Sequence, residues 1–139
     1  MTTEESIPTA PVGEAPGEGK SSKAKTHFFW GMLSHAFLDY SMGKIDERRV
    51  KRYLDGAERK GADITALRDW RPTFQQRINL KLMISVVDAV SIFKNSERSP
   101  IDEFLVLGAV DESPAWQCLY NLACRLLTFR GVNLAVATP

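Results

Sequence analysis

Apolar residues recur every three or four positions along most of this chain, and that spacing is the strongest constraint on its fold. Within residues 44–61, Val50, Tyr53, Leu54 and Ala57 follow the i, i+3, i+4, i+7 pattern of one helical face. Runs that alternate polar and apolar residues, as half-buried strands require, are few. The pattern predicts an all-α fold, a single compact bundle of five or six helices around one core.

Signals for the starts and ends of helices divide the chain. A capping box, in which two side chains three positions apart satisfy each other's backbone N–H groups, lies at Thr73 and Gln76 and opens the longest expected helix, 74–94. Serine–proline pairs of the kind that begins a helix lie at Ser99–Pro100 and Ser113–Pro114. Glycines suited to helix ends follow at Gly43, Gly61 and Gly131.

The helix expected over 74–94 is apolar around most of its circumference. One stripe comprises Phe74, Ile78, Leu82, Val86, Ala89 and Phe93. A second set comprises Leu80, Met83, Ile84, Val87 and Val90. Such a pattern predicts a central, largely enclosed helix. Lys81 and Asp88 share its narrow polar strip, which we expect to face water or a partner chain, with a buried functional site as the alternative.

Composition separates the first residues from the rest of the chain. Residues 1–24 are rich in Pro, Gly, Ser, Thr and Glu, a composition that cannot bury enough surface to offset the entropy of ordering. We therefore expect a disordered tail over 1–24, either a leader or a docking segment, and one helical domain over 25–139. The tail lacks the features of a signal peptide. The longest apolar run, 78–93, is short for a membrane span and carries charges.

Cysteine usage indicates a reducing compartment. Cys118 and Cys124 are too few for a disulfide framework, and their spacing points them in different directions on a helix. We expect two buried thiols. Together with the absence of a signal peptide or membrane span in the sequence, they predict a cytoplasmic protein without membrane contact.

Sequence motifs of catalysis are missing. The chain has no phosphate-binding glycine loop, no G-x-S-x-G and no H-E-x-x-H. Its two histidines, His27 and His35, have no Cys or close carboxylate pair at metal-ligand spacing. Ser34 precedes His35 directly, so the two diverge on a helix and do not suit a nucleophile–base pair. We predict no enzyme activity, no metal, no cofactor and no small-molecule substrate.

The centre of the chain is basic. Residues 44–81 hold 11 Lys and Arg against 6 Asp and Glu. Opposite the apolar face of the helix within 44–61 lie Arg48, Lys51, Arg52, Asp55 and Arg59. We predict that nucleic-acid backbone binds here, because cations neutralise phosphates and the paired N–H donors of Arg match the oxygens of a phosphate. The predicted ligands are Arg48, Lys51, Arg52, Arg59, Arg68 and Arg71. In the alternative, Asp55 pairs with Lys51 and Arg59, and the face is merely solvated.

A short resemblance points the same way. The stretch GKIDERRVKRYL, residues 43–54, resembles the basic helix of the small helical subunits of multi-subunit CRISPR effector complexes. The resemblance implies a small, non-catalytic subunit that contacts the backbone of a guide or target strand. It covers no more than these residues, and we assign the chain to no family on its account.

Aromatic residues near the first expected helix support a second function. Phe28 and Trp30 stand at its start, and we predict that they bind a partner, with core packing as an equal alternative. The alternative function is therefore a helical protein–protein adaptor or regulator with no nucleic-acid contact. In either case we expect a protein partner or a homo-oligomer.

Overall fold

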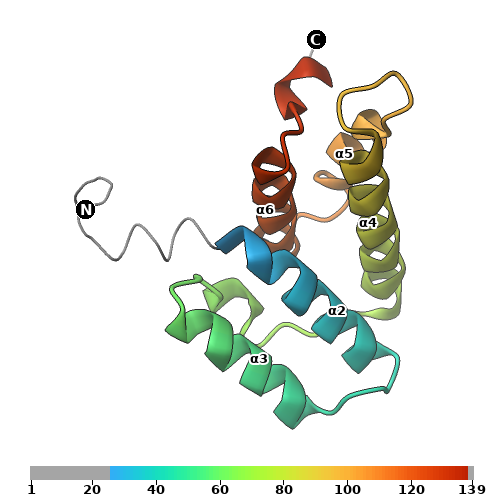
Figure 1. Ribbon diagram of the computed structural model, residues 1–139. Helices are drawn as coiled ribbons and strands as arrows, with labels where there is room; N and C mark the ends of the chain where they lie inside the picture. The colour runs from blue at the N-terminus through green and yellow to red at the C-terminus, as the bar shows by residue number, and fades with distance from the viewer. Residues whose placement is uncertain (1–25, 138–139) are drawn as a thin grey trace, which may run out of the picture.

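The computed structural model describes residues 26–137, which form five α-helices and three short 3-10 turns, with no strand in this range (Figure 1). The α-helices are α2 (Phe29–Ser41), α3 (Glu47–Arg59), α4 (Phe74–Phe93), α5 (Ile101–Leu107) and α6 (Pro114–Phe129). The turns are η1 (Thr26–Phe28), η2 (Thr65–Leu67) and η3 (Leu134–Ala137). The predicted all-α class is confirmed. The tail predicted over 1–24 lies outside the described residues.

Local signals set most of the helix ends. Thr73 and Gln76 form the predicted reciprocal capping box at the start of α4, and the Ser113 hydroxyl accepts the Trp116 N–H at the start of α6. A glycine with positive φ follows each of α2, α3 and α6 and ends the helix, as predicted. These glycines are Gly43, Gly61 and Gly131. One prediction is wrong: Ser99 does not cap α5. Pro100 has a ψ of 44°, outside the helical range, so the helix begins only after it.

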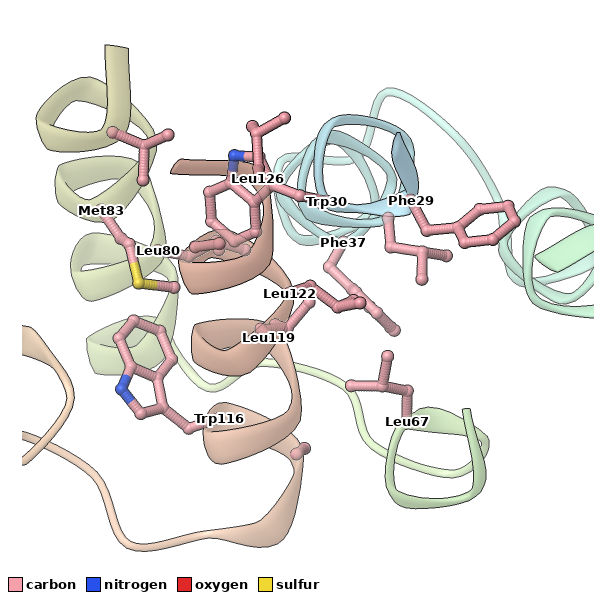
Figure 2. Packing of buried hydrophobic residues seen from close by; sticks show 14 of the residues in the cluster. Phe29, Trp30, Phe37, Leu67, Leu80, Met83, Trp116, Leu119, Leu122 and Leu126 are labelled. Atoms are coloured by element: carbon pink, nitrogen blue, oxygen red, sulfur yellow. The ribbon is translucent and has the colours of Figure 1, made fainter. Parts of the chain in front are cut away.

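The core lies between α2, α4 and α6. Figure 2 shows Leu80 and Met83 of α4 pointing toward α6, where Trp116 is fully buried. The Trp116 indole N–H donates to the Leu107 carbonyl at 2.8 Å, so its burial leaves no unpaired donor. Apolar packing between these helices therefore includes the one polar group of this side chain without leaving it unpaired.

Only one face of α4 is buried, which corrects the prediction of an enclosed helix. Its buried residues are Leu80, Met83, Val87 and Val90. On the outward face, Phe74 is 69% exposed and Leu82 is 50% exposed. The reason is that the helices packed against α4 are α2, α5 and α6, and α4 lies at the edge of the molecule (Figure 1). Within residues 26–137, no helix reaches the combination of length and hydropathy that crossing a bilayer demands, α4 included.

Two neighbouring leucines test this assignment of faces. Leu80→Ala removes a fully buried side chain and should lower the free energy of unfolding by about 2–5 kcal/mol. Leu82→Ala, the matched change on the outward face, should lower it by less than about 1 kcal/mol. Urea denaturation of the dilute protein measures both. Equal losses would contradict the described orientation of α4.

Candidate nucleic-acid interface

Helix α3 presents its basic residues to solvent. Its buried face is Val50, Leu54 and Ala57, as predicted, and Asp46 caps its first turn by accepting the Arg49 N–H at 3.0 Å. The six basic residues of α3 and its C-terminal end are all exposed: Arg48, Arg49, Lys51, Arg52, Arg59 and Lys60. The amphipathic pattern alone is enough to place them there.

Two of the acidic residues on α3 are paired with Arg68, which lies just after η2. The Arg68 guanidinium donates to Asp55 at 2.6 Å and to Glu58 at 2.7 Å. Asp55 therefore pairs across the fold, and not along its own helix as the solvated-face alternative required. Among the described residues, no ion pair includes Lys51 or Arg59.

The side chain of Arg71 is more buried than that of Arg68. Its guanidinium donates to both oxygens of Glu47, with an Nη2–Oε2 distance of 2.5 Å. It lies over the rings of Phe37 and Tyr40, 5.7 and 5.8 Å from their centres. Its Nη1 also donates to the backbone carbonyls of Leu67, Arg68 and Trp70. Arg71 thus ties its own turn to both α2 and α3.

These contacts change the predicted site. The structure brings Arg68 and Arg71 beside α3, but both guanidinium groups face its acids, so neither is an unpaired phosphate ligand. Arg71 offsets the charge of Glu47. The single charge of Arg68 is shared between Asp55 and Glu58, so one negative charge remains among these acids. The six exposed Arg and Lys residues of α3 outnumber it, and positive charge predominates on this helix of mixed charge.

The two aromatics predicted to bind a partner have different surroundings. Trp30 is 3% exposed and belongs to the core, so it is not available to a partner. Phe28 is 57% exposed and meets the ring of Phe129, edge to face, at 5.8 Å. His27 is buried between them and stacks on Phe129 at 4.0 Å. The exposed aromatic pair is therefore Phe28 and Phe129, of which the sequence analysis identified one.

A hollow of about 800 Å³ lies between η2 and α6, and the thiol that lines it is not activated. Cys118 lines it, and burial, with a further contribution from Asp63, raises the pKa of the thiol above its ordinary value. A protonated thiol is a weak nucleophile and a weak metal ligand. The described residues hold no group of three His, Cys, Asp or Glu side chains placed to bind a metal.

No protein-family model, curated protein or solved structure matches this chain. Its exposed surfaces therefore carry the information about its function. Of these, the α3 face is the one whose chemistry selects a class of ligand, since exposed cations without acidic partners suit an anion.

The internal role of Arg71 predicts a stability difference between two arginines. Arg71→Ala removes an ion pair and three backbone hydrogen bonds, and should lower the free energy of unfolding by about 2 kcal/mol. Arg52→Ala, the matched exposed change, should shift it by less than about 0.5 kcal/mol. Chemical denaturation at neutral pH measures both values.

The stability that Arg71 contributes should depend on pH, because its partner Glu47 can be protonated. The hydrogen bond from Arg71 is the main reason why the pKa of the Glu47 carboxyl lies below its ordinary value of 4.5. Because the folded pKa is lowered, the stabilisation is complete above the unfolded pKa and is lost as pH falls through the folded one. The difference between wild type and Arg71→Ala should therefore shrink below about pH 4. A constant difference down to about pH 3 would argue against the pair.

Proposed function

We propose that this protein is a non-catalytic accessory subunit, built as a compact helical bundle, that contacts nucleic-acid backbone through α3 within a larger assembly. The supporting observation is that Arg68 and Arg71 pair with the acids of α3, so that its six basic side chains stay exposed without ion pairs among the described residues. The free thiols of Cys118 and Cys124 support a cytoplasmic location.

The size of the α3 face suits a phosphate backbone. From Arg48 to Arg59 the helix rises about 16 Å, which matches the rise of roughly five nucleotides along one strand. Among the exposed cations stands no exposed aromatic ring, since Tyr53 is partly buried. Base stacking therefore plays no part in the proposal, and the expected binding is independent of sequence and sensitive to salt.

Charge reversal on two surfaces tests the proposal. Lys51→Glu with Arg52→Glu changes the α3 face, and Lys94→Glu with Arg98→Glu makes the same change in charge after α4. We expect the protein to bind labelled single- or double-stranded DNA or RNA with an affinity that falls steeply with salt. The α3 variant should bind about tenfold more weakly or worse, and the control nearly as wild type. Fluorescence anisotropy over a salt series measures this.

Two outcomes would contradict the proposal. Absence of binding even at low salt would remove nucleic acid as a ligand. Equal losses in the two variants would show a response to net charge alone and no role for the α3 face. Circular dichroism of each variant controls for loss of helical structure.

The alternative is a helical protein–protein adaptor or regulator with no nucleic-acid contact. The exposed ring pair of Phe28 and Phe129 supports it, because aromatic side chains are enriched where proteins meet. Failure to bind nucleic acid at low salt, together with capture of a protein partner that Phe28→Ser abolishes, would favour this function.

A further inference from the structure

The outward face of α4 carries a continuous strip of apolar and small residues. We call it the α4 strip, and its members are Phe74, Ile78, Leu82, Ser85, Ala89 and Ile92. At the end of the helix Ile92 is 75% exposed. At its start the Arg77 guanidinium lies over the Phe74 ring at 5.0 Å, and Phe74 is still largely exposed. Monomeric proteins rarely leave so long an apolar surface in water. Another protein surface is therefore expected to cover it.

The strip is hollowed near its first half. A depression of about 450 Å³ runs beside it, and Met42 at the end of α2 forms its other wall. Met42 is itself exposed, and the rest of the lining mixes apolar with polar side chains: Arg77, Ile78, Lys81, Leu82 and Ser85. A protruding apolar side chain from a partner would fit between these two walls.

The charges on one edge of the strip indicate which partner fits. Lys81 and Asp88 lie on the same edge, two helical turns and about 10 Å apart, too far to pair with each other. Both are exposed, and neither forms an ion pair with another described residue. Ser85 lies next to the midpoint between them. When two copies of such a helix pack antiparallel about a two-fold axis at the midpoint, the positive charge of each copy faces the negative charge of the other.

We infer that two copies of this chain associate by packing α4 against α4, antiparallel, about a two-fold axis that passes between Ile84 and Ser85. That axis places Lys81 of each copy opposite Asp88 of the other, on the same edge of the interface. It also brings Ile92 of one copy to within one residue of the position opposite Ile78 of the other, at the depression bordered by Met42. The small side chains of Ser85 and Ala89 allow the helices to approach closely.

The size of the strip sets the expected affinity. α4 has 20 residues and is about 30 Å long. A strip roughly 12 Å wide then offers on the order of 400 Å² per copy, about half of what a standard interface buries on each partner. The dimer should therefore be weak, with a dissociation constant in the micromolar range. A partner with only acidic charges would fit less well, since Asp88 would oppose it.

Sedimentation of the full chain without nucleic acid tests the inference, from about 1 to about 300 µM to span that range. Wild type should show a reversible monomer–dimer equilibrium. Lys81→Glu and Asp88→Lys each place two pairs of like charges across the axis, so each should weaken the dimer about tenfold or more. An equimolar mixture of the two variants should recover the affinity of wild type, because every contact in the mixed dimer again joins opposite charges.

Recovery in the mixture is specific to the proposed pairing, since no contact within one chain produces it. Leu82→Glu should abolish the dimer, while Val106→Glu, the matched change of an exposed apolar residue on α5, should leave it intact. A protein that stays monomeric at every concentration would leave the α4 strip to a different partner and overturn the inference. So would a dimer that survives Leu82→Glu, or a mixture that shows no recovery. None of these outcomes depends on whether α3 binds nucleic acid.

Discussion

The guanidinium of Arg71 is the contact on which the described arrangement depends. It joins Glu47 of α3, the rings of Phe37 and Tyr40 on α2, and the backbone of its own turn. A planar cation with five donors is suited to such a junction, where a lysine would supply one point charge. With Arg68, it also pairs with the acids of α3 and leaves the bases of that helix exposed. The same pairs that position α3 therefore give it a cationic surface.

The two unpartnered surfaces differ in chemistry and lie on different helices. α3 offers cations that suit phosphate, while α4 offers an apolar strip that suits another protein. Since the proposed dimer uses α4 and the end of α2, each copy would keep its α3 face. Two weak phosphate-binding faces joined in one particle bind a long strand more tightly than either does alone, provided that both reach it. The proposed self-association and the proposed backbone contact are thus compatible with each other.

Local patterns in the sequence predicted what depends on near neighbours. The buried face of α3 and the capping box of α4 follow from spacings of three and four residues, and both are confirmed. The enclosure of α4 was predicted wrongly, because apolar periodicity identifies residues that avoid water but not the number of helices that cover them. The partner of Asp55 also depended on the fold, since Arg68 reaches it from 13 positions away. Trp30 lies two positions after Phe28, about 200° further around a helix, so the two could not share one surface.

A residue-resolved titration tests the central claim, that the exposed bases of α3 meet phosphate while Arg68 and Arg71 stay occupied within the fold. The measurement is the NMR shift of backbone amides and arginine Nε–H groups on addition of a short duplex at low salt. We expect shifts in α3 and at the Nε–H groups of its own arginines, with Arg71 unchanged. Shifts centred elsewhere, or on Arg71 with loss of its contact to Glu47, would contradict the account.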